Sequence, residues 1–127
     1  MREIHTENAP ASIGPFSQAI EDGDRIYVSG QGPIDPASDE ILDGDVAAQT
    51  ARTLENVDAI LQAAGCSLDD VVKTTVFVRD MDDYDAVNEV YGEYLSEPYP
   101  ARSAVEIVRL PVDIDVEIEA IATTANR

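Results

Sequence analysis

The chain has 127 residues, of which 44% are apolar, and these values predict one globular domain spanning residues 1–127. Its 26 acidic and 8 basic residues give a net charge of −18. This charge argues against a nucleic-acid partner, because binding to phosphate backbones depends on clustered lysine and arginine. The acidic residues are spread along the chain, as expected for a halophilic protein whose surface repulsion is screened by salt.

Several other classes of protein are disfavoured by the sequence. No apolar run approaches the roughly 20 residues of a membrane span, and the amino terminus has no apolar signal core, so we expect a cytoplasmic protein without membrane contact. Cys66 and His5 are the only cysteine and the only histidine. They can form neither an intrachain disulfide nor a zinc cluster. We expect Cys66 to pack in the core and His5 to be solvated.

The first half of the chain predicts a sheet edge followed by a long helix. A short strand is expected near residues 2–6, and strands over 16–21 and 25–29 flank Asp22-Gly23, which suits a tight hairpin turn. After a loop over 30–44, apolar residues recur with helical spacing. Asp45 or Asp43 can cap the start of this helix, and Gly65 fits the position just past its end. The helical stripe consists of Val46, Thr50, Leu54, Val57, Leu61 and Ala64.

The second half predicts a central strand, a second helix and two further strands. Residues 71–78 are rich in β-branched side chains, as in a central strand. Asp82 or Asp83 is expected to cap the second helix, and Pro98 and Pro100 follow its end. Its buried side would carry Tyr84, Val87, Tyr91 and Tyr94 or Leu95. The element order predicts an α+β fold, a mixed six-stranded sheet with two helices packed on one face.

The two C-terminal strands carry the candidate chemistry. Because side chains alternate along a strand, Arg102 and Ser103 of the first strand are expected to lie on different faces of the sheet. By the same alternation, Glu117 is expected on the face away from the buried residues of the second strand. We interpret Arg102 and Glu117 as sharing the sheet face that the helices leave bare, beside Phe77 or Val78. A guanidinium suits a carboxylate ligand, and a nearby glutamate can manage a water or a proton. The same two residues could instead form a cross-strand charge pair, worth about 0.2–1 kcal/mol.

The bare face itself indicates an oligomer. It would mix charged side chains with apolar ones such as Ile121, and such a mixture is more typical of an interface than of a free surface. A ligand site at that seam would be desolvated, which strengthens a contact between arginine and a carboxylate.

Motifs along nearly the whole chain carry a family resemblance. They are Glu7-Asn8-Ala9-Pro10, Ile13-Gly14-Pro15-Phe16, Ser29-Gly30-Gln31, Gln49 and Asn56, residues 72–78, Val87-Asn88, residues 100–106 and residues 117–122. In this order and spacing the chain resembles the RidA (YjgF, or L-PSP) family of reactive imine deaminases.

The resemblance implies a chorismate-mutase-like α+β fold and a homotrimer with sites between subunits. It implies hydrolysis of 2-iminobutanoate and 2-iminopropanoate, made when dehydratases act on threonine or serine, to 2-keto acids and ammonia. Arg102 matches the arginine that binds the substrate carboxylate, and Glu117 matches the glutamate that handles the attacking water. Ser29 and Gly30 match the loop near the substrate, and Asn88 matches an asparagine of the pocket. No metal or organic cofactor is implied.

Two positions depart from the family pattern. Phe16 stands where the deaminases usually carry tyrosine, so a hydroxyl is absent although the ring can still wall the pocket. We expect a lower rate or a preference for more apolar substrates. Ala104 stands where bacterial members often have cysteine, and we expect little loss from that change.

Three alternatives remain open from the sequence. Asn88 could simply bond neighbouring backbone. The protein could bind a small acid as a sensor, or act as a chaperone, in which case Glu117 would be dispensable. Cleavage of single-stranded RNA, attributed to some relatives, is disfavoured by the acidic surface.

Overall fold

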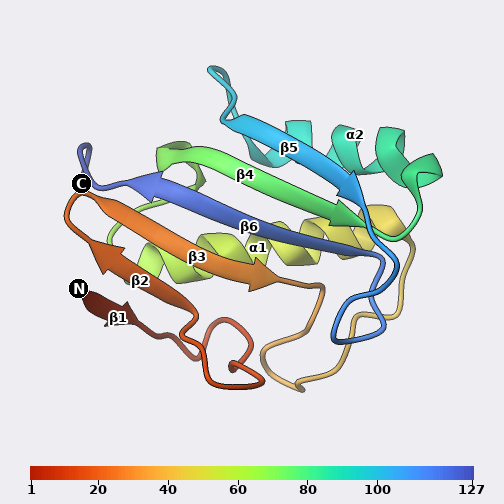
Figure 1. The fold of residues 1–127 in the computed structure, drawn as a ribbon, viewed down its shortest axis with the longest axis horizontal. Coiled ribbons are helices and arrows are strands. Elements are labelled where there is room, and N and C mark those ends of the chain that lie inside the picture. Colours follow the sequence, from red (N-terminus) through yellow and green to blue (C-terminus); the bar gives the residue numbers. More distant parts are fainter.

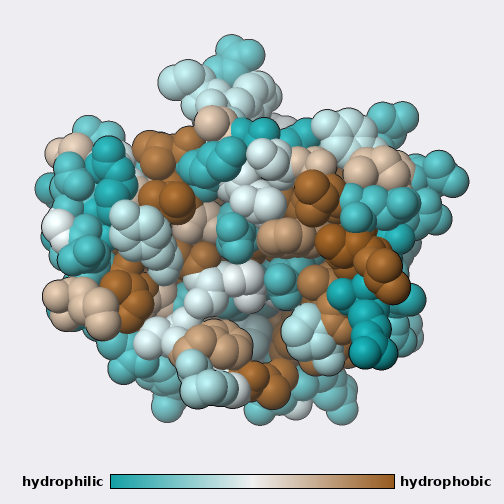
Figure 2. All heavy atoms as spheres, in the orientation of Figure 1, coloured by the Kyte–Doolittle hydropathy of each residue, from teal (hydrophilic) through white to brown (hydrophobic).

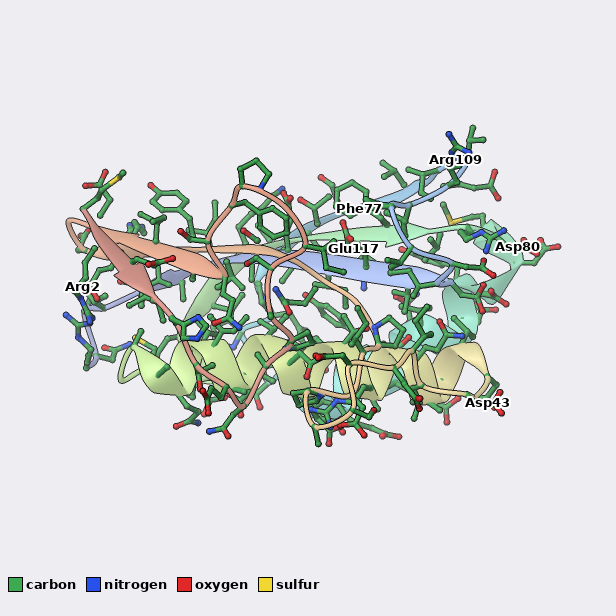
Figure 3. All side chains as sticks on the ribbon, turned by 90° about the horizontal axis from the view of Figure 1, so that it is seen from below. Arg2, Asp43, Phe77, Asp80, Arg109 and Glu117 are labelled. Atoms are coloured by element: carbon green, nitrogen blue, oxygen red, sulfur yellow. The ribbon has the colours of Figure 1, made fainter.

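The computed structural model describes all residues from 1 to 127 and contains one six-stranded sheet and two α-helices. The strands lie in the order β1-β2-β3-β6-β4-β5; β4 and β5 are parallel, and all other neighbours are antiparallel. Both helices cover one face of the sheet (Figures 1 and 3), which confirms the predicted mixed sheet. The elements are β1 (Arg2–Ile4), β2 (Ala19–Asp22), β3 (Arg25–Gln31), α1 (Val46–Ala63), β4 (Val71–Val78), α2 (Tyr84–Tyr94), β5 (Ala101–Glu106) and β6 (Val116–Thr123).

The boundaries of α1 follow from its capping residues. The Asp45 carboxylate accepts a hydrogen bond from the backbone N–H of Ala48 at 2.9 Å, so Asp45 rather than Asp43 is the cap. Gly65 takes a φ of +78° and donates its N–H to the carbonyl of Gln62, which ends the helix as predicted.

No helix of the chain is both long and apolar enough to cross a bilayer.

The start of α2 differs from the expectation. Asp83 is the residue before the helix but makes no side-chain cap. A short 3₁₀ turn over Met81–Asp83 precedes the helix, and Asp80 caps that turn by accepting from the N–H of Asp82. The capping carboxylate therefore comes earlier than either residue expected from the sequence.

The core lies between the sheet and the helices. Cys66 is buried there as predicted, and His5 is exposed. The main fully buried contributions come from Ile26, Val76, Val78 and Ile118 of the sheet and from Leu54, Val57, Ile60 and Leu61 of α1.

The opposite, open face of the sheet has no covering element (Figure 1). Figure 2 shows this face, with apolar side chains scattered among polar ones. Tyr27 and Val105 are 46% and 40% exposed there, and Phe77 projects on the same side (Figure 3). Val78, the alternative to Phe77, faces the core instead.

Candidate active site

Glu117 lies on the open face of the sheet, where the sequence placed it. Its neighbours in β6, Val116 and Ile118, are fully buried on the helix side, whereas Glu117 projects beside Phe77 of β4 (Figure 3). A Cβ atom added to Gly30 would lie 2.5 Å from Oε2 of Glu117. Glycine at position 30 therefore leaves room for the carboxylate, because any side chain there would displace it.

Gly30 and Ser29 form an irregularity in β3 that brings the Phe16 loop to Glu117. The pairing of β3 with β6 shifts register between Val28 and Gln31, as at a β-bulge. The Ser29 hydroxyl donates to the carbonyl of Ser17 at 2.7 Å, and its N–H donates to the carbonyl of Gln18 at 2.9 Å. The bulge is thereby fastened to the segment just after Phe16.

The Phe16 segment is a loop, although the sequence predicted a strand from residue 16. The strand begins only at Ala19, where its pairing with Ile4 of β1 and Val28 of β3 begins, and Gln18 lies just before it. Its side chain is buried, accepts from the N–H of Thr6 at 2.8 Å and donates to the carbonyl of Pro10 at 2.9 Å. These bonds hold the N-terminal loop and the Phe16 loop together.

A small cavity of about 140 Å³ opens beside Glu117 and Gly30. Its walls are largely apolar, with Phe16 and Ile13 among them. Both side chains are unusually exposed for their size, at 50% and 72%. The cavity is thus a half-open hollow on the open face.

The protonation of Glu117 is shifted by its surroundings. Burial raises the pKa of this carboxyl above its ordinary value, and the negative charge of Glu119 raises it further. The carboxylate accepts no hydrogen bond within the chain, so nothing offsets its desolvation. A carboxylate with a raised pKa is a stronger base, which suits proton transfer.

Arg102 lies on the other side of the sheet, and the prediction that it shares a face with Glu117 is wrong. In β5 it pairs beside Thr74 of β4, which is 2% exposed and faces the helices. Glu117 pairs beside Phe77, three residues along β4 and on the open face. The sequence correctly predicted that side chains alternate along β5. However, Val105 on the open face and Ala104 on the helix face are both apolar, so residue polarity could not show which set of side chains faces the helices.

The guanidinium of Arg102 packs on two tyrosine rings of α2. Its central carbon lies 4.8 Å from the centre of the Tyr91 ring and 5.5 Å from that of Tyr84, within the range of cation–π attraction. Nη2 donates to the Tyr84 hydroxyl at 2.9 Å. Sequence reasoning assigned these tyrosines only to packing. The signal that points to them is their spacing with Asn88, since residues 84, 88 and 91 share one helix face.

Arg102 has no acidic partner. Five of the chain's arginines form ion pairs, namely Arg2, Arg25, Arg52, Arg79 and Arg127. In a chain with 26 acidic residues, the guanidinium of Arg102 is held by aromatic rings instead. The cross-strand charge pair with Glu117 is therefore absent, and Arg102 keeps the N–H groups that it does not donate to Tyr84 available for an external anion.

Asn88 lies in the same hollow as Arg102. The two side chains line a cavity of about 310 Å³ together with Tyr91, Tyr99 and Pro100. Oδ1 of Asn88 is buried and has no hydrogen-bond partner. The structure thus shows no capping bond for this side chain.

The predicted residues fall into two groups on opposite faces of one subunit. Phe16 and Gly30 line the cavity beside Glu117, and Ser29 fastens the adjoining bulge, whereas Asn88 accompanies Arg102. A larger hollow of about 590 Å³, between residues 68–72 and the loop 96–100, contains neither group. No cluster of three or more potential metal ligands is present.

Comparison with known proteins identifies the family. The family described as Endoribonuclease L-PSP matches residues 6–124. A RutC family protein of Pyrococcus horikoshii is 57% identical over 119 residues, 94% of each chain. The 2-iminobutanoate/2-iminopropanoate deaminase of Escherichia coli K12 is 50% identical over 95% of this chain and 96% of that one. The crystal structure of E. coli TdcF with bound serine has a TM-score of 0.91 at 43% identity, covering 97% of this chain and 98% of that chain. The chain therefore belongs to the RidA (YjgF, L-PSP) family.

Proposed function

We propose that the protein hydrolyses 2-iminobutanoate and 2-iminopropanoate to 2-keto acids and ammonia, at sites formed between subunits of a homotrimer. The observation that carries this proposal is a pair of hollows, each of which presents only one of the two groups that the reaction needs. One presents a guanidinium without an acidic partner, and the other presents a desolvated carboxylate. The relatives support the reaction class, since one of them at 50% identity is a deaminase of this kind.

Arg102 would bind the substrate. A guanidinium can donate two parallel hydrogen bonds to a carboxylate, which fixes the plane of the adjoining C=N group. The tyrosine rings restrict the guanidinium before substrate arrives, so less freedom is lost on binding. A serine-bound relative, E. coli TdcF, supports a ligand of this size and chemistry.

Glu117 would manage the proton transfers. Water adds to the carbon of the protonated imine while the Glu117 carboxylate accepts one of the water protons, giving a neutral tetrahedral adduct that carries a hydroxyl and an amino group. Glu117 then returns this proton to the nitrogen. The C–N bond breaks and ammonia leaves, while the hydroxyl gives its proton to the Glu117 carboxylate and becomes the carbonyl. Acid–base help of this kind contributes about 10²–10⁴ in rate.

A second subunit would complete the site. Because Arg102 and Glu117 lie on opposite faces of the sheet, one subunit cannot present both to a small substrate. The open face carries exposed Tyr27 and Val105, which favours its burial against another copy. We propose that the Arg102 hollow of one copy meets the Glu117 hollow of the next.

Two other roles are less well supported. A sensor or chaperone would need Arg102 but would give no reason for a desolvated carboxylate facing a hollow. RNA cleavage, suggested by the description of the family, conflicts with a net charge of −18.

The decisive assay generates 2-iminobutanoate in place with a threonine dehydratase and traps it with semicarbazide in high-salt buffer. The protein should reduce semicarbazone formation and accelerate the release of ammonia and keto acid. A folded, oligomeric protein that leaves semicarbazone formation unchanged would refute the deaminase proposal and favour a binding role.

Replacing Phe16 by tyrosine should raise the deamination rate. Phe16 borders the Glu117 cavity, and a hydroxyl there would add one hydrogen bond to water or substrate, worth about 0.5–1.5 kcal/mol. We expect roughly a 2- to 10-fold faster reaction, measured by the trapping assay. A slower reaction at unchanged thermal stability would show instead that the apolar ring is matched to the substrate.

A further inference from the structure

Tyr84 and Tyr91 both contact Arg102, but their hydroxyl groups are used differently. Tyr91 is 5% exposed, and its hydroxyl shares a buried hydrogen bond of 2.8 Å with the hydroxyl of Thr74. The Tyr91 phenol is thereby tied to β4, and only its ring is presented to the guanidinium.

The Tyr84 hydroxyl instead accepts a hydrogen bond from Nη2 of Arg102 at 2.9 Å. A phenol has one proton to donate, and that of Tyr84 has no acceptor within the chain. The residue is half-buried, and no carboxylate pairs with the neighbouring guanidinium. The Tyr84 O–H, which donates no hydrogen bond within the chain, therefore lies directly beside a guanidinium that pairs with no carboxylate.

We propose that Tyr84 is a substrate-binding residue, whose hydroxyl donates to the same carboxylate that Arg102 binds. This inference rests on the proposed function for the identity of the ligand, a 2-imino or 2-keto acid. The bond from Arg102 polarises the phenol and makes its O–H a stronger donor, as in other hydrogen-bond chains. The same bond fixes the guanidinium relative to the phenol, so the carboxylate meets donors that are already in place.

The arrangement selects for the charged carboxylate rather than for the rest of the ligand. An anionic oxygen can accept from both the guanidinium and the phenol, and hydrogen bonds to charged groups are about twice as strong as neutral ones. A neutral amide in the same position offers one weaker acceptor. Tyr84 should thus add affinity for 2-keto and 2-imino acids and little for their amides.

The test is calorimetric binding of 2-oxobutanoate, the stable product, and of 2-oxobutanamide in high-salt buffer. Tyr84→Phe keeps the ring and removes only the hydroxyl. We expect this variant to bind 2-oxobutanoate about tenfold more weakly and the amide as the wild type does. In an Arg102→Ala background the same substitution should cause little further loss, since the two donors act on one group.

Tyr94→Phe is the matched control, because it removes a phenol from the same helix where Tyr94 packs against the core rather than against Arg102. Unchanged affinity of Tyr84→Phe for 2-oxobutanoate would overturn the inference. So would an equal loss in Tyr94→Phe, or a full additional loss in the Arg102→Ala background. If the wild type binds 2-oxobutanoate through Tyr84 but releases no ammonia from the imine, the inference stands and deamination fails.

Discussion

Replacing Glu117 by glutamine should abolish deamination and, at neutral pH, leave the fold at least as stable as the wild type. Glutamine keeps the shape of the side chain beside Gly30 but cannot accept a proton from water, so a rate loss of about 10²–10⁴ is expected. The gain in stability follows from desolvation, because the wild-type carboxylate is partly buried without a hydrogen bond.

The direction of the stability effect follows from the pKa shift. Burial and Glu119 raise the pKa of Glu117 in the folded state, so the folded protein binds this proton more tightly than the unfolded chain does. The contribution of Glu117 to stability is fully present below the unfolded pKa and is lost as pH rises through the raised folded pKa. Glutamine is neutral throughout, so its advantage over glutamate should appear near pH 7 and vanish in acid.

The effect on stability is measured by thermal unfolding of both proteins at pH 7 and at pH 4. The effect on the deamination rate is measured by the trapping assay. The wild-type rate should also fall on the acidic side at a pH above the ordinary pKa of glutamate, since the base must be ionised. A variant that loses activity and stability together at pH 7 would identify Glu117 as a structural residue. A variant with full activity would remove it from the mechanism.

Much of the fold follows from regular patterns in the sequence. The stripe of α1 and the β-branched run of β4 each repeat over many residues, so their periods define helix and strand, and Asp45 and Gly65 mark the ends of α1. The alternation of β6 is equally clear, because Val116, Ile118 and Ala120 are all apolar and buried while glutamates occupy the positions between them. The sequence therefore predicted correctly that Glu117 lies on the open face of the sheet.

The predictions that were wrong concern features that depend on contacts between distant segments. In the edge strand β5 both faces carry apolar side chains, and the face of Arg102 is decided by its packing on tyrosines of α2. An arginine stem can pack on aromatic rings as readily as it can face water. β2 begins only at Ala19, which pairs with Val28 just before the bulge of β3, and local propensity does not encode this pairing. The role of Tyr84 appears only once Arg102 is beside it.

Subunits that are each inactive should restore activity when they assemble together. Arg102→Ala and Glu117→Gln disable different hollows, and in one subunit these hollows lie on opposite faces of the sheet. If each site takes Arg102 from one copy and Glu117 from its neighbour, a mixed trimer contains some sites with both residues intact. Random assembly from equal amounts leaves about one quarter of the sites complete, so about one quarter of wild-type activity is expected.

Co-expression of the two variants with different affinity tags, followed by sequential purification on both tags, yields only mixed oligomers for the trapping assay. This selection removes the homogeneous assemblies, so the measured activity should exceed that of the random mixture. Each variant purified alone is the control and should remain inactive. If the mixed oligomers are also inactive, Arg102 and Glu117 must act within one subunit or at separate places, and the site between copies is wrong. Because the two substitutions lie on opposite faces, recovered activity has one structural explanation: two copies meet so that the guanidinium of one faces the carboxylate of the other.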